Sequence, residues 1–178
     1  MFTHGERIIA AMLADIGQHL KVKGNVDFAE IESAIGHYQE WSIAQTHSHI
    51  VPDGFEMPPH VRETHDILNM WRVLDDAIAA LTPADRTKLG SLPGVPAQPG
   101  FSGFDANNED HYHAAKYMID NMGLYPERKG KPLNSHSPTI GMYRRMYAAY
   151  RKVMDRKAFG AGWTAADVEE VLRAVPHP

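Results

Sequence analysis

The sequence contains no cysteine among its 178 residues. This absence excludes disulfide bonds, thiolate nucleophiles and sulfur-ligated metal sites, and it fits a reducing compartment. No apolar run approaches the ~18 residues of a membrane-spanning helix, and the first residues lack the uninterrupted apolar segment of a signal peptide. We therefore expect a cytoplasmic protein that makes no contact with a membrane.

Motifs for nucleotides and metals are missing as well. Neither Gly-x-x-x-x-Gly-Lys nor Gly-x-Gly-x-x-Gly occurs. Four histidines and two acids flank one loop and offer nitrogen and oxygen ligands: His47, His49, His60, His65, Asp53 and Glu56. However, no His-x-x-x-His or His-Glu-x-x-His pattern places two of them on one helical face. We predict no bound metal and no cofactor, with His47 and His49 complementing a helix C-terminus instead.

Composition and periodicity predict an all-α fold. Hydrophobic residues make up 43% of the chain and charged residues 22%, which is ordinary for a soluble globular protein. Apolar residues recur at helical spacing from end to end, and no run alternates apolar with polar residues as a half-buried strand does. We predict one domain, residues 1–178, built as a bundle of about six to seven helices.

Start and stop signals place these helices along the chain. They cover residues 6–21, 27–46, 58–81, 83–89, 106–122, 138–157 and 164–174, with N-caps at Asp27, Thr82, Asp105, Ser137 and Thr164. The first helix carries an apolar stripe of Ile8, Ile9, Met12, Leu13, Ile16 and Leu20. The third is apolar around nearly half its circumference, so we expect it at the centre of the core. Residues 91–104, rich in proline and glycine, are expected to cross the surface between two helical groups.

The helix at residues 138–157 is divided most cleanly into two faces. Ser137 is the expected cap and Pro138 suits the first turn. One face is apolar and holds Ile140, Met142, Tyr143, Met146, Tyr147, Tyr150, Val153 and Met154. The opposite face is basic and holds Arg144, Arg145, Arg151, Lys152 and Arg156. We call these five residues the basic face.

Charge is distributed unevenly around this helix. Residues 125–157 hold nine Lys or Arg and two acids, a local net charge of +7 in a chain whose formal total is −4, so the remainder is −11. Such asymmetry favours an acidic partner, either protein or nucleic acid. Nucleic acid is the less favoured version, because the whole chain is acidic and the aromatic residues lie opposite the arginines. The alternative is that the basic face meets acidic surface of the same chain, or water.

The loop at residues 125–137 is the best candidate for binding a small anion. Its candidate ligands are Arg128, Lys129, Lys131, Asn134, Ser135 and His136. They precede a helix N-terminus, whose N–H groups attract phosphate or carboxylate. A second interpretation is that Asn134, Ser135 and His136 only shape the turn. An enzyme would use His111 or His136 as acid or base, although a buried structural role for His111 is the simpler alternative.

Four blocks are spread over almost the whole chain: Asp66-Ile-Leu-Asn-Met70, Gly103-Phe-Asp105, Asn134-Ser-His136 with Tyr143-Arg-Arg-Met146, and Trp163-Thr-Ala-Ala-Asp167. In this order and spacing they resemble the YfbU family. The resemblance implies a largely helical protein of the bacterial cytoplasm, and it carries no activity, cofactor or catalytic residue with it. Some longer relatives carry an added N-terminal segment similar to a ribbon-helix-helix DNA-binding module. This chain begins at its first helix, so we do not expect DNA binding by that route.

The functional hypothesis is therefore association rather than a named chemistry. We expect a homo-oligomer, most simply a dimer, that presents a surface such as the basic face to another macromolecule. The alternative is an enzyme or binding protein for a small anionic ligand at the 125–137 loop.

Overall fold

The computed structural model describes residues 2–51, 56–93, 95, 97–158 and 160–175. Within them the chain forms eight α-helices, one 3-10 turn and no strand, which confirms the predicted all-α class. The elements are α1 (His4–His19), α2 (Phe28–Gly36), α3 (Trp41–Thr46), α4 (Pro59–Ala80), α5 (Pro83–Gly90), α6 (His111–Asp120), η1 (Pro126–Arg128), α7 (Ile140–Arg156) and α8 (Ala165–Leu172). In the described part of the chain, no helix is both long and apolar enough to cross a membrane.

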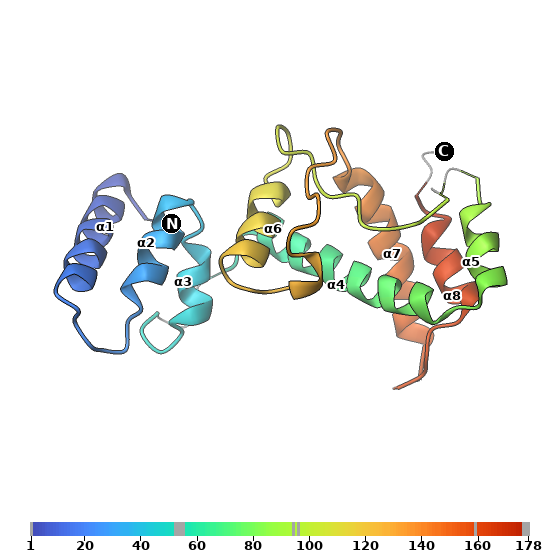
Figure 1. Ribbon diagram of the computed structural model, residues 1–178, viewed down its shortest axis with the longest axis horizontal. Helices are drawn as coiled ribbons and strands as arrows, with labels where there is room; N and C mark the ends of the chain where they lie inside the picture. Colours follow the sequence, from blue (N-terminus) through green and yellow to red (C-terminus); the bar gives the residue numbers. More distant parts are fainter. Residues whose placement is uncertain (1, 52–55, 94, 96, 159, 176–178) are drawn as a thin grey trace.

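The molecule is elongated, and α4 runs along its middle (Figure 1). Helices α6, α7 and α8 pack against α4, and α8 also contacts α5. Helix α4 buries Ile67, Leu68, Met70 and Leu74 almost completely, which confirms its expected place at the centre of the core. The core continues into α7 and α8, where residues such as Tyr143 are fully buried.

Helices α1, α2 and α3 form one end of the elongated molecule (Figure 1). Trp41 of α3 joins this end to the rest, since its ring meets Tyr117 edge-on at a centroid distance of 6.2 Å and His65 at 6.4 Å. Asn121 Nδ2 also donates to Ser33 Oγ at 3.1 Å. Helix α1 contacts α2 and contributes no side chain to the main hydrophobic core.

The predicted helix at residues 27–46 is two helices, and that prediction was wrong. Asp27 caps α2 as expected, accepting from the backbone of Ala29 and Glu30. The helix ends at Gly36, and Tyr38 then takes a left-handed conformation with φ of 57°. Tyr38 rather than a glycine thus takes the left-handed position that follows a helix end. Trp41, at the start of α3, is thereby turned into the core.

Two other helix starts were also wrongly predicted. Helix α6 begins at His111 rather than Ala106, because Asp105 caps a preceding turn, accepting from Asn107 N at 3.0 Å and Asn108 Nδ2 at 2.6 Å. Helix α7 begins at Ile140, and Ser137 is not its cap. By contrast, the predicted caps of α5 and α8 are confirmed, with hydroxyl oxygens of Thr82 and Thr164 accepting from the N–H groups of Asp85 and Asp167.

The Pro/Gly-rich connection runs along the molecule before α6, with Gly94 and Pro96 outside the described residues (Figure 1). Gly103 is required near its end, since φ is +85° and an added Cβ would lie 2.1 Å from Leu133 O. Next to it, Phe104 N donates to Leu133 O at 2.8 Å, and Ser135 N donates to Phe104 O at 3.0 Å. These bonds fasten the connection to the 125–137 loop.

Candidate functional site

Part of the basic face of α7 is engaged within the chain. Arg144 donates through Nε and Nη2 to both carboxylate oxygens of Glu63 on α4, at 2.7 and 2.9 Å. Arg145 donates to the carbonyl oxygens of Ala174 and Val175, at 3.2 and 3.0 Å. These two arginines therefore join α7 to α4 and to the segment after α8.

The end of the basic face divides between paired and exposed residues. Arg156 donates to Asp167 Oδ1 at 3.2 Å. Burial alone raises the pKa of Asp167, but hydrogen bonds from Lys157, Thr164 and Arg156 outweigh it and leave that pKa well below its usual range. Arg151 is exposed, and its nearest carboxylate among ion pairs of the described residues is that of Asp155 on its own helix, at 3.8 Å. Lys152 is exposed and forms no ion pair with any residue that the structure describes.

The cations of the 125–137 loop do not converge on one point. Arg128 is buried, is paired with Asp75 of α4, and lies 5.1 Å from the centroid of the Phe101 ring. Lys129 and Lys131 are exposed. Arg128, which was expected to bind an anion, is therefore buried and paired within the chain. Of the three cations, the two lysines remain at the surface.

The polar residues after these cations shape the turn. Asn134 Oδ1 accepts from the N–H groups of Ala106 and His136, at 3.2 and 3.0 Å. Ser135 donates from its hydroxyl to Ser137 O at 2.6 Å. His136 is exposed and takes a left-handed conformation with φ of 56°. These contacts match the interpretation in which the three residues fix the path of the loop.

The N-terminus of α7 already holds an anion, the carboxylate of Glu109. Glu109 is 7% exposed. Its Oε1 accepts from Thr139 N at 2.6 Å and Ile140 N at 2.7 Å, while Oε2 accepts from Asp105 N at 2.8 Å. Two of the N–H groups that were expected to attract a ligand, those of Thr139 and Ile140, are thus bound by a side chain from 30 residues earlier.

Glu63 is the centre of a polar cluster between α4, α6 and α7. Its Oε2 lies 2.9 Å from His111 Nε2, and its other contacts are the two bonds from Arg144. The hydrogen bond from Arg144 holds the pKa of Glu63 below its usual value, although burial opposes this. A cavity of about 270 Å³ adjoins the cluster and is lined by Pro59, Arg62, Glu63, Asp66, Ile67, Arg144 and Tyr147.

His111 has the environment of a structural histidine. Its ring stacks on Phe104 at a centroid distance of 5.5 Å, and the residue is 7% exposed. Since a carboxylate only accepts, Nε2 donates to Glu63, and the buried Nδ1 has no partner among the described residues. The ring is therefore held by packing and by one charged hydrogen bond.

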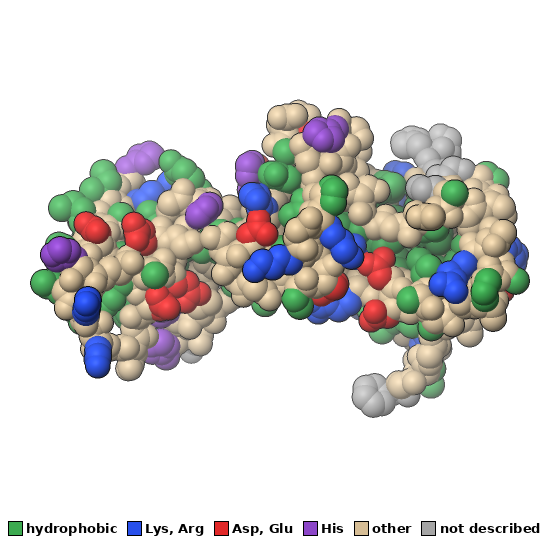
Figure 2. Space-filling model, viewed as in Figure 1, with side chains coloured by type: hydrophobic (Ala, Val, Ile, Leu, Met, Phe, Trp, Pro, Cys, Tyr) green, Lys and Arg blue, Asp and Glu red, His purple; other side chains and the backbone are tan. Residues whose placement is uncertain are grey.

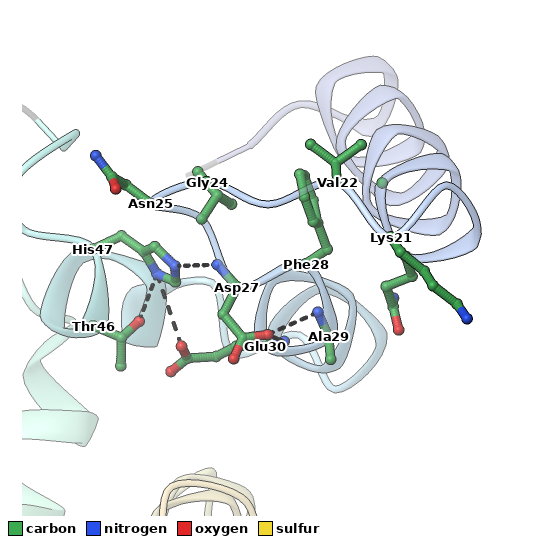
Figure 3. Close-up of a pocket in the computed structure, with 13 residues that line it drawn as sticks. Lys21, Val22, Gly24, Asn25, Asp27, Phe28, Ala29, Glu30, Thr46 and His47 are labelled. Carbon is green, nitrogen blue, oxygen red and sulfur yellow. Dashed lines mark hydrogen bonds and ion pairs between the residues drawn. The ribbon is translucent and has the colours of Figure 1, made fainter.

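A larger, open cavity of about 610 Å³ lies beside α1, α2 and α3 (Figure 3). His47 lines it, with Nε2 accepting from Asp27 N at 3.0 Å and Nδ1 lying 2.9 Å from Thr46 Oγ1. Both ring nitrogens are thus occupied, so His47 is committed to joining α3 to the start of α2 rather than to a metal. Asp53, another ligand considered for a metal, lies outside the described residues.

Helix α1 exposes a continuous row of large aliphatic side chains. The exposed fractions are 61% for Ile8, 59% for Ile9, 60% for Met12, 59% for Leu13, 50% for Ile16 and 66% for Leu20. We call these six residues the α1 apolar face. Hydrophobic side chains are visible on the outer surface at the α1 end of the molecule (Figure 2). Scattered apolar residues are ordinary on a surface, but a contiguous row marks a contact site.

Small residues explain why this face points outward. Ala14 and Gly17 are the only buried residues of α1. At 100° per residue Ala14 lies opposite the stripe, and Gly17 lies beside it on the flank next to Leu13. The ring of Phe28 in α2 would lie 2.7 Å from a Cβ at Gly17, so the two helices approach closely there. Arg7, on the same side as Ala14, pairs with Glu40 at 2.5 Å. Helix α1 is therefore anchored by its small and charged side.

Comparison with protein-family models decides the identity of the chain. The model of the YfbU domain matches residues 2–174. The chain belongs to the YfbU family. In this YfbU domain the match includes both the α1 apolar face and the Glu63 cluster, so neither is an appendage to the family fold.

The YfbU domain is expected to lose stability as the pH falls from about 7 to 5. Burial lowers the pKa of His65 and of His60. Protonated His65 would need an acceptor for its buried Nε2, which has none among the described residues. Because the unfolded chain then takes up protons first, stability is fully present above the ordinary histidine pKa of about 6.5 and declines below it.

Urea unfolding at several pH values measures this loss. A double substitution, His60→Gln with His65→Gln, should flatten the dependence between pH 7 and 5, whatever its effect on stability at pH 7. The exposed His113 provides the control, since His113→Gln should leave the slope unchanged. An unchanged slope in the double variant would show that other groups cause the dependence.

Proposed function

We propose that this YfbU protein acts by macromolecular association and that the α1 apolar face is its contact surface. The main support for this proposal is that six large aliphatic side chains of one helix are each at least half exposed. With side chains of this size, the face offers roughly 700 Å² of accessible surface, above the roughly 300–600 Å² of the largest apolar patch on a typical monomer. Covering it removes apolar surface from water, which favours association.

The basic face is a secondary contact surface in this proposal. Three arginines of this face, Arg144, Arg145 and Arg156, donate hydrogen bonds to groups of the same chain. An acidic partner would therefore contact chiefly Arg151 and Lys152. Surface ion pairs contribute little by themselves. We place the basic face at the rim of an association, where it steers a partner by long-range charge.

The alternative of a small anionic ligand receives less support. Arg128 is paired with Asp75, and Glu109 accepts from two N–H groups at the start of α7. Of the three cations of this loop, Lys129 and Lys131 remain exposed. We propose that the protein works in the bacterial cytoplasm, a reducing compartment that suits a chain without cysteine.

Affinity capture with matched surface variants tests the proposal. Immobilised wild-type protein and two variants, Met12→Glu on α1 and Arg151→Glu with Lys152→Glu on α7, are exposed to a bacterial lysate with and without nuclease. We expect the α1 variant to lose the macromolecules that the wild type retains, untagged copies of this chain included. The α7 variant should keep them, and nuclease should make no difference. Equal capture by the wild type and the α1 variant would refute the proposal.

A further inference from the structure

We infer that the α1 apolar face is covered by the same face of a second copy of this chain, with the two α1 helices antiparallel. This inference rests on the proposed function, because it names the partner of the same surface. The two-fold axis would pass between Met12 and Leu13. Three features of α1 carry it: the size of the face, the order of its residues and the position of its charges.

The exposed area is close to what a stable dimer requires. Roughly 700 Å² on each copy compares with the ~800 Å² per partner of a standard protein interface. The six side chains of the α1 apolar face therefore supply nearly all of this area by themselves.

The middle of the face reads nearly the same in both directions, whereas Ile8 and Leu20 at its ends would lie opposite Gly17 and Gly5. From Ile9 to Ile16 the sequence is Ile-Ala-Ala-Met-Leu-Ala-Asp-Ile, with one isoleucine at each end and Met12 and Leu13 at the midpoint. In an antiparallel pair, Ile9 of one copy meets Ile16 of the other, while Met12 and Leu13 meet across the axis. A two-fold interface needs this kind of self-complementary surface, whereas a foreign partner places no such requirement on the order.

The charges on α1 favour the antiparallel direction. Glu6 is near the start of the helix, and Lys21 and Lys23 follow its end. Antiparallel pairing brings Glu6 of one copy toward the lysines of the other and opposes the two helix dipoles, whereas parallel pairing sets like charges together. Arg7 does not disturb this pattern, since Glu40 already neutralises it at 2.5 Å.

A membrane surface fits the same face less well. Helices that lie on membranes carry lysine and arginine along their polar side, where they meet anionic lipid. On α1 the side of Ala14 and Gly17 is packed against α2, and Arg7 is paired. A protein partner that brings its own aliphatic face is therefore favoured.

Single cysteines test the inference, because the chain has none of its own. The variants are Met12→Cys, Ile9→Cys and Ile16→Cys, each made in the full chain, with Met154→Cys as a collision control on α7, where Met154 is 41% exposed. After mild oxidation, non-reducing gels report covalent dimers. Circular dichroism verifies that each variant stays folded, which is expected because these side chains contact little of their own chain.

The expected pattern is specific to antiparallel packing. Met12→Cys should cross-link to itself almost completely, since its two copies are offset by about one residue, or ~1.5 Å, along the axis. Ile9→Cys and Ile16→Cys should cross-link only when mixed, because identical positions lie seven residues, or ~10 Å, apart, beyond the ~7 Å reach of a disulfide. Met154→Cys should stay at the background level.

Other outcomes would overturn the inference in distinguishable ways. Self-cross-linking at all three α1 positions indicates a parallel pair and refutes the antiparallel arrangement. Cross-linking no greater than that of Met154→Cys means that a second copy does not cover the face. In that case Met12→Glu shows what the surface contacts instead. If this variant loses captured macromolecules, the surface binds another macromolecule, so the proposed function stands and the second-copy inference fails. If it loses binding to phosphatidylglycerol vesicles, the surface binds a membrane, so the second-copy inference fails and the proposed function does not stand.

Discussion

Replacing Glu109 by alanine is expected to lower the free energy of unfolding by about 3 kcal/mol. The carboxylate is buried and accepts from the backbone N–H groups of Asp105, Thr139 and Ile140. Its loss leaves three N–H groups without an acceptor, two at the start of α7 and that of Asp105 in the turn before α6. It also removes a negative charge from the N-terminus of α7. Chemical denaturation at pH 7 measures the change.

Two comparisons separate this cap from a general effect of acidic residues. Asp110→Ala removes the adjacent acid, whose exposed side chain caps nothing, and should cost less than about 0.5 kcal/mol. Glu109→Gln keeps one acceptor oxygen but sets an amide N–H against a backbone donor, so it should fall between the two. If Glu109→Ala costs no more than Asp110→Ala, the carboxylate does not fasten α7 as described.

The second large effect concerns association. Met12→Glu is expected to weaken the dimer by about 1,000-fold or more, because two carboxylates would be brought together next to the two-fold axis in an apolar contact, at roughly 2 kcal/mol each. Met12 is 60% exposed in the single chain, so the same change should leave the thermal unfolding of the isolated chain within about 0.5 kcal/mol. Analytical ultracentrifugation measures the dissociation constants.

Met154→Glu provides the matched control for this prediction. Met154 is the large exposed aliphatic residue of α7, 41% exposed, and replacing it introduces the same charge at a distant surface. The control should dimerise as the wild type does. Equal weakening by both substitutions would indicate an effect of net charge rather than of the α1 apolar face.

Local signals predicted the starts of α5 and α8, where the deciding contacts are local. Thr82 before Pro83, and Thr164 three residues before Asp167, carry their capping partners within one turn, and both helices begin as expected. The apolar periodicity of residues 58–81 likewise identified α4 as the central helix. Local contacts also misled the prediction at Asp105, which caps a turn rather than α6, and one error arose from a long-range contact. The start of α7 depends on Glu109, 30 residues away, which no local pattern around Ser137 reveals.

The candidate sites show the same division. Periodicity revealed the stripe on α1, yet it could not reveal that Ala14 and Gly17 hold α2 and leave the stripe outward. Charge counting found the basic face but could not show that Arg144 is committed to Glu63, 81 residues earlier. The small residues of α1 were the signal that could have revealed the exposed face. A helix with large apolar residues on one side and small residues on the other has two faces that can pack.

The mass of the wild-type chain in solution tests the central claim most directly. Sedimentation equilibrium over a concentration series, on the full cysteine-free protein near pH 7, gives this mass without any substitution. We predict twice the 19.9 kDa of one chain at micromolar concentration, with reversible dissociation on dilution. A mass of one chain throughout the series would contradict the pairing of two α1 apolar faces.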